Sequence, residues 1–254
     1  TKLWNASRFI LMNLSDEIEK PELPAELMLE DKWLLSKYNK LVKVVTDNLE
    51  KFELGVASQN IYDFIWDIFC DWYIEISKAR LQAGGETALN AQKVLVYVMS
   101  GMLRLLHPFM PFITEEIWQA LPNDCETIML APFPTYEEKL DFAADEAEFE
   151  QIMDAIKAVR AVRAEKNVPP SRKAHLFIET ANGDTFRKGV SFFERLASAS
   201  EVSVGESFTV ENAVQALTHS ARIYLPMGEL IDLDKERARL QKEQESCQKD
   251  IDII

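Results

Sequence analysis

Apolar side chains recur every three or four positions through the first 121 residues of this 254-residue chain. That spacing places them on one side of an α-helix, so the pattern predicts a succession of amphipathic helices. Helix-breaking residues divide the succession, as at Pro21, Gly84 and Pro108. Because the connections that they leave are short, the sequence predicts an up-and-down helical bundle over residues 1–130.

Two aromatic-rich segments supply the expected core of this bundle. One continuous helix is expected from about residue 57 to 81, and its spacing turns Ile61, Ile65 and Ile68 inward. A shorter helix is expected after the proline corner and before Pro122. The aromatic residues that we expect in the core are Phe69, Trp72, Phe112 and Trp118.

The helical pattern stops near residue 130. Residues 131–147 are predicted to form an acidic linker. Residues 148–227 mix helical and strand-like runs, among them a strand at Ala174–Glu179 and a helix from Gly183 to about Ala197, and predict a small α+β domain. Residues 228–254 repeat every seven positions and predict the first helix of a truncated antiparallel coiled coil. The predicted fold class is therefore mostly α: an up-and-down bundle, a small α+β domain and the start of a coiled-coil arm.

The net charge of the chain is −14, which argues against a polyanionic partner. The local distribution differs, because residues 157–173 contain six basic residues and one acid, Glu165. Charges act over a Debye length of roughly 8–10 Å, so a local excess matters more than the total. This basic stretch is either a solvated helix face or a contact for a phosphate backbone.

No sequence pattern predicts a catalytic centre or a metal site. The cysteines lie far apart, the histidines lack a metal-ligand spacing, and no glycine-rich phosphate loop occurs. Glu115 and Glu116 point about 100° apart and are interpreted as acids at a solvated helix start. No apolar run reaches the roughly 20 residues of a membrane span, and no signal peptide is visible at Thr1. We therefore expect a piece of a longer cytoplasmic protein.

The first helix carries the clearest candidate for a binding surface. Asn5, Arg8, Phe9 and Met12 fall opposite its apolar stripe. An arginine and an aromatic ring on an exposed face can hydrogen-bond to and stack on unpaired RNA bases. The alternative is that this face packs on a neighbouring domain. The apolar stripe is expected to contain Leu3, Trp4, Ser7, Ile10, Leu11 and Leu14.

Five segments, taken together and in order, form a specific family signature. Each segment alone is a signature of only moderate specificity. They are Lys2–Phe9, Phe69–Tyr73, Leu105–Trp118, Arg160–Ser171 and Asp232–Leu240. In this order they closely resemble the C-terminal part of class I valyl-tRNA synthetases, and the resemblance covers nearly the whole chain. The first three resemble the anticodon-binding domain, the fourth the junction region and the fifth the start of the coiled-coil arm.

The resemblance implies membership of an enzyme family that joins valine to tRNA with ATP and magnesium. The H-I-G-H and K-M-S-K-S signatures and the editing domain are absent here, so this chain is expected to bind tRNA without catalysis and without a cofactor or metal of its own. The expected partner is valine-specific tRNA, bound by a monomer, with no DNA or membrane. Arg8 is the first candidate for tRNA contact, and Arg160, Arg163 and Lys166 are candidates for backbone contacts or for ion pairs in the junction. The tRNA-binding candidates are Arg8, Phe9, Asn5, Arg160, Arg163 and Lys166.

Two alternatives remain open on the sequence. The acidic charge and the unpaired heptad repeat of residues 228–254 suit a non-enzymatic scaffold that recruits a protein partner. An isoleucyl- or leucyl-type synthetase shares the bundle and the P-x-x-x-E-E-x-W pattern. The string Phe69–Tyr73 and the absence of a cysteine-rich zinc region favour the valine enzyme.

Overall fold

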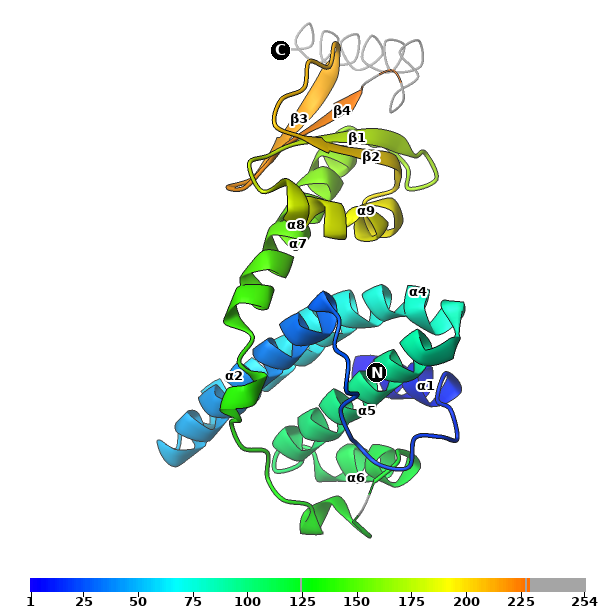
Figure 1. The fold of residues 1–254 in the computed structure, drawn as a ribbon. Helices are drawn as coiled ribbons and strands as arrows, with labels where there is room; N and C mark the ends of the chain where they lie inside the picture. Colours follow the sequence, from blue (N-terminus) through cyan, green and yellow to red (C-terminus); the bar gives the residue numbers. More distant parts are fainter. Residues whose placement is uncertain (124, 227, 229–254) are drawn as a thin grey trace, which may run out of the picture. The chain divides into compact units, whose positions relative to one another are not determined.

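The computed structural model describes residues 1–123, 125–226 and 228 (Figure 1). They belong to two compact units, Thr1–Phe149 and Glu150–Ile254, and the boundary between the units lies within one helix. Apart from Gly228, the predicted coiled-coil arm lies outside the described residues. Within the described ranges, no helix is both long enough and apolar enough to cross a membrane.

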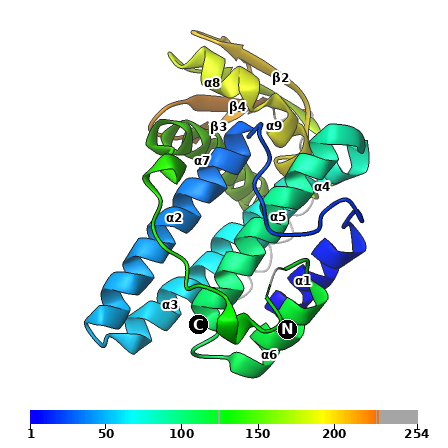
Figure 2. The same cartoon turned by 60° about the horizontal axis from the view of Figure 1, so that its bottom comes forward.

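The first unit is helical, as its apolar spacing predicts. Helix α2 (Leu29–Glu50) packs against α5 (Gly85–Leu106). Helix α1 (Lys2–Met12) lies against α5 and α6 (Pro111–Ala120) (Figure 2). Two short 3-10 turns follow: η2 (Ile128–Leu130) at the end of the range predicted for the bundle, and η3 (Glu138–Leu140) in the predicted linker. The helices are α1 (Lys2–Met12), α2 (Leu29–Glu50), α3 (Leu54–Asp63), η1 (Phe64–Tyr73), α4 (Ile74–Ala83), α5 (Gly85–Leu106), α6 (Pro111–Ala120) and α7 (Ala143–Glu165), which continues into the second unit.

The long helix expected in the middle of the bundle is not α-helical throughout. Its central segment, η1, is a π-helix between α3 and α4. In a π-helix each N–H bonds the carbonyl five residues back, so the positions that share a side differ from those of an α-helix. Phe64 and Phe69 are both buried, whereas Trp66 and Asp71 are both exposed. Ile68, which an α-helical spacing turns inward, is only half-buried.

The core of the first unit contains three of the four aromatic residues predicted for it. Phe69 and Trp118 are at most 1% exposed, and Trp72 is 9% exposed. The prediction for Phe112 is wrong, because this side chain is 91% exposed. The α6 helix turns Ile117 and Trp118 inward, and its period places Phe112 on the other side.

A buried ionic cluster joins the start of α2 to η1 and α4. The Arg80 Nη1 donates to Asp31 Oδ1 at 2.6 Å and to Glu30 Oε1 at 3.2 Å. The Tyr73 hydroxyl donates to the same Asp31 oxygen at 2.5 Å. Burial, with the nearby charge of Asp31, raises the pKa of Glu30. Because buried charges are tolerated only when paired, this cluster fixes how the three segments meet.

Among the described residues, the second unit forms a four-stranded sheet in the order β2-β1-β4-β3. Strand β1 pairs in parallel with β2, and the crossover between them contains α8 and α9. Strand β4 is antiparallel to both β1 and β3. The two crossover helices and the later part of α7 cover one face of the sheet (Figure 1). The elements are β1 (Ala174–Glu179), α8 (Gly183–Lys188), α9 (Val190–Leu196), β2 (Ala199–Gly205), β3 (Ala213–Leu217) and β4 (Arg222–Pro226).

The α7 helix closes the core of this unit with Ile152, Ile156 and Val159, each at most 1% exposed. It approaches Gly189 closely, since a Cβ there would lie 2.9 Å from the Ile152 Cγ2. Strand β1 alternates buried and half-buried residues, as expected for a sheet covered on one face. A mostly α fold with a small α+β part is therefore confirmed.

Candidate functional site

The outer side of α1 exposes Asn5, Arg8 and Met12, as its helical spacing predicts. Arg8 forms no hydrogen bond or ion pair with the rest of the described chain. Trp4 was expected in the apolar stripe, but it is 41% exposed. The buried stripe is narrower than predicted and consists of Leu3, Ala6, Ser7 and Ile10.

Phe9 faces the neighbouring helix α4 rather than the exposed row. Its ring is half-buried, and the Lys78 Nζ lies 5.8 Å from the ring centroid. Lys78 also donates to Glu75 Oε1 at 2.5 Å. Phe9 is therefore partly engaged within the unit, whereas Arg8 is open to a partner.

A stacked aromatic pair beside the first turn of α1 was not among the sequence candidates. The exposed rings of Tyr62 and Trp66 stack with centroids 5.5 Å apart. The Lys2 Nζ lies 3.8 Å from the Trp66 ring centroid and 2.6 Å from Asp71 Oδ1. The signal that could have revealed the pair is its spacing of four, which places two side chains on one helix face.

These groups give the first unit a surface of exposed rings and two basic side chains, of which Arg8 is exposed and Lys2 half-buried. We name the exposed row of α1, together with the lysine and aromatic pair at its first turn, the α1 surface. Aromatic rings stack on bases of any sequence, at about 1–3 kcal/mol per base. An arginine adds donors for base edges or phosphates. The residues of the α1 surface are Lys2, Asn5, Arg8, Met12, Tyr62 and Trp66.

Two of the predicted basic residues lie near the end of α7 in the second unit. Arg160 is exposed, and its Nε donates to the Leu196 carbonyl at 2.6 Å. The Lys166 Nζ pairs with Glu165 Oε1 at 2.8 Å. The first contact holds the arginine at the surface, and the second partly neutralises the lysine.

Arg163, the third of these candidates, is buried. It is only 5% exposed, and its Nη2 donates to the carbonyl oxygens of Pro169 and Arg172. These bonds attach the loop after α7 to the helix that precedes it. The sequence did not reveal this role, because carbonyl partners leave no charge pattern.

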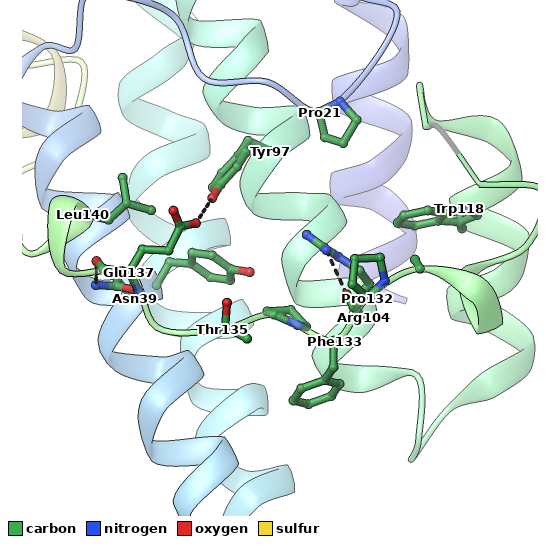
Figure 3. A pocket seen from close by; sticks show the side chains of 13 residues that line it. Pro21, Asn39, Tyr97, Arg104, Trp118, Pro132, Phe133, Thr135, Glu137 and Leu140 are labelled. Carbon is green, nitrogen blue, oxygen red and sulfur yellow. Dashed lines mark hydrogen bonds between the residues drawn. The ribbon is translucent and has the colours of Figure 1, made fainter.

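A pocket of about 350 Å³ lies between the bundle and the predicted linker (Figure 3). The Asn39 side chain exchanges two hydrogen bonds with the Glu137 backbone, at 2.8 and 2.9 Å. The Tyr97 hydroxyl donates to Glu137 Oε1 at 3.3 Å, and the Arg104 Nη1 to the Pro132 carbonyl at 3.0 Å. These polar groups bond one another, so their evident role is to attach the linker to the bundle.

The acidic pair on α6 does not lie at a helix start, as the sequence had suggested. The helix begins at Pro111, and Glu115 accepts from Gln119 Nε2 at 2.7 Å. It also accepts from Thr127 Oγ1 at 2.9 Å and Ile128 N at 3.2 Å, and these bonds, led by that of Gln119, lower the pKa of Glu115. Within the described part of the chain, no three His, Cys, Asp or Glu residues gather as metal ligands do.

Comparison with known proteins shows that the chain is similar to tRNA ligases. The family model described as "Anticodon-binding domain of tRNA ligase" matches residues 31–178. A valine–tRNA ligase of Clostridium acetobutylicum is 49% identical over the whole chain, and one of Clostridium tetani is 47% identical over 94% of it. That of Bacillus cereus is 42% identical over 95% of the chain.

The chain spans 29% of the length of the first of these relatives and 28% of the other two. The matches do not favour a scaffold protein or a synthetase for isoleucine or leucine. The matched segment includes most of the bundle and reaches into the second unit. The chain therefore belongs to the family of anticodon-binding domains of tRNA ligases.

Proposed function

We propose that this chain is the tRNA-binding, C-terminal part of a valine–tRNA ligase that works as a monomer in the cytoplasm. Its relatives are named for the joining of valine to tRNA, which supports this assignment. That reaction is expected to use ATP and magnesium, and the described residues include neither a glycine-rich phosphate loop nor a cluster of metal ligands. We assign that chemistry to other parts of the enzyme.

The proposed role of the bundle is to bind the anticodon stem-loop through the α1 surface. The observation that carries this proposal is the exposure of Arg8 without a partner among the described residues, on the same helix whose Lys2 lies over the exposed Trp66 ring. Arg8 would donate to a base edge or a phosphate, and Asn5 can both donate to and accept from a base. Tyr62 and Trp66 would stack on unpaired bases.

Replacement of Arg8 by alanine tests this role. We expect Arg8→Ala to weaken binding of the isolated anticodon stem-loop of valine tRNA by about tenfold, since hydrogen bonds to charged groups contribute about 1.5–3 kcal/mol. Arg8→Lys keeps the charge but loses the planar fork, so an intermediate affinity is expected. Fluorescence anisotropy at one fixed KCl concentration measures the affinity of the wild type and of both variants for the stem-loop.

The exposed Lys139 provides a control, because Lys139→Ala removes a cation of the same unit that is not part of the α1 surface and pairs with Glu137. Wild-type affinity in Arg8→Ala, with the anticodon still discriminated, would assign Arg8 to packing on another domain. If the wild-type chain binds stem-loops with the correct and a changed anticodon equally, the proposed function is wrong.

A further inference from the structure

The second unit contains a pocket of about 450 Å³ whose charged lining residues are all arginines. It lies between the end of α7, the loop that follows, and the connection from α9 to β2. The three arginines are Arg160, Arg163 and Arg195, and none of the described residues that line the pocket is acidic. The volume far exceeds the ~30 Å³ that one water takes up in the liquid.

Arg163 forms the buried part of this lining. Its Nη2 is occupied by two carbonyl oxygens, but its buried Nη1 has no hydrogen-bond partner among the described residues. Burial alone lowers the pKa of the Arg163 guanidinium, and no carboxylate acts against that effect. A guanidinium nevertheless stays protonated in proteins. The lining of the pocket therefore contains a buried positive charge, that of Arg163, which no anion of the described chain neutralises.

Arg160 and Arg195 are exposed at the rim of the same pocket. The bond from the Arg160 Nε to the Leu196 carbonyl orients its guanidinium beside the connection from α9 to β2. Because these two arginines are exposed to solvent, they can contact an anionic group on a macromolecule as well as a free ion. Buried charges are normally paired, and the planar fork of arginine matches the oxygens of a phosphate.

We infer that this pocket is a binding site for a phosphate group of the RNA backbone. The inference rests on the proposed function only in taking tRNA as the source of the phosphate. The buried Arg163 charge attracts the group, and Arg160 and Arg195 donate hydrogen bonds to its oxygens. Because a phosphate is present at every nucleotide, this contact adds affinity without reading the anticodon.

The main test is the substitution Arg195→Gln in the whole chain, with Arg160→Gln as a second variant. Binding is measured by anisotropy with valine tRNA and with the same tRNA carrying a changed anticodon, between 50 and 300 mM KCl. We expect each variant to weaken binding of both RNAs by the same factor, about tenfold. The slope of log K against log [KCl] should become shallower by about one unit, as for one lost phosphate contact.

Arg187→Gln is the matched control, because Arg187 is an exposed arginine of the same unit, paired with Asp184 outside the pocket. It should bind both RNAs like the wild type, and circular dichroism verifies that every variant is folded. Wild-type affinity and salt slope in both pocket variants would overturn the inference.

The source of the phosphate is tested with inorganic phosphate alone, titrated against the wild type and Arg195→Gln. If inorganic phosphate binds in an Arg195-dependent way while tRNA affinity is unchanged, the RNA assignment is wrong and the site binds a free anion. If the pocket variants weaken binding but the anticodon has no effect on the wild type, the pocket stands and the proposed function fails. The two ideas can thus fail separately.

Discussion

Phe69 and Phe112 are the same residue type in opposite environments. Phe69 is fully buried in η1, whereas Phe112 is 91% exposed near the start of α6. Composition and aromatic density are similar around both, so the sequence placed both in the core. What separates them is the direction in which each helix turns its side chains, and this depends on tertiary neighbours.

The two phenylalanines therefore make a matched pair for stability measurements. Phe69→Ala removes a fully buried ring and leaves a cavity, so we expect a loss of about 3–5 kcal/mol in the free energy of unfolding. Phe112→Ala should change that free energy by less than about 0.5 kcal/mol. Urea unfolding followed by circular dichroism measures both. Equal losses in the two variants would contradict the burial described here.

The binding candidates show how far residue-level prediction reaches. The helical period correctly placed Asn5, Arg8 and Met12 on the exposed side of α1, because amphipathic spacing is a local property. The stack of Tyr62 on Trp66 was not among the candidates, although its spacing of four places both side chains on one helix face. Nor could the helical period separate the buried Arg163 from its exposed neighbours in the same basic stretch.

At the scale of the elements, the close approach of α2 and α5 depends on Gly101. A Cβ at this position would overlap the hydroxyl and ring of Tyr38, which is buried in α2. The ring is rigid and surrounded, so it has little room to move. Gly55 in α3 differs, because nothing lies within 4 Å of where its Cβ would be.

Alanine substitutions at these two glycines should therefore have opposite effects. Gly101→Ala should destabilise the chain by about 1–3 kcal/mol through overpacking. Gly55→Ala should stabilise it by up to about 1 kcal/mol, since alanine is the better helix former. Midpoints of urea unfolding compare the two. Stabilisation by both would show that the two helices can separate without cost.

Helices and strands themselves were predicted well, because they follow from periods of 3.6 and 2 in the sequence. Strand β1 (Ala174–Glu179) lies where its apolar run indicated. The predicted helix after Gly183 is divided into α8 and α9 at Gly189, a position that contacts Ile152. The π-helix was missed because no short motif distinguishes it from an α-helix.

At the scale of the molecule, the first unit is held together partly by Glu146 at the start of α7. Its carboxylate accepts from Ser36 at 2.5 Å and Lys40 at 2.7 Å, and Lys37 lies 3.1 Å away. Burial opposes ionisation, but these bonds outweigh it and lower the pKa of Glu146 below its usual 4.5. An acid with a lowered folded pKa stabilises the fold above pH 4.5 and loses this effect as the pH falls through the folded value.

Glu146→Gln tests this pH dependence. We expect a loss of about 1.5–3 kcal/mol at pH 7, where the carboxylate is charged and hydrogen-bonded. The difference from the wild type should shrink below pH 4.5, since protonation then removes the charge from the wild type as well. Urea unfolding at pH 7, 5 and 3 measures it, with the exposed Glu17→Gln as control. A difference that is constant over this range would exclude the ionic contribution.

The π-helix η1 has a practical consequence for protein engineering. Substitution sites on an ordinary helix are chosen at intervals of three, four or seven, whereas here a seven-residue step leads from the exposed Trp66 to the buried Tyr73. A mutational scan designed on the usual heptad would mix interior and surface positions between Phe64 and Tyr73, and its results would look erratic. A library chosen from the exposure of each residue would vary the outer positions, Trp66, Asp67 and Asp71, and leave the buried ones unchanged.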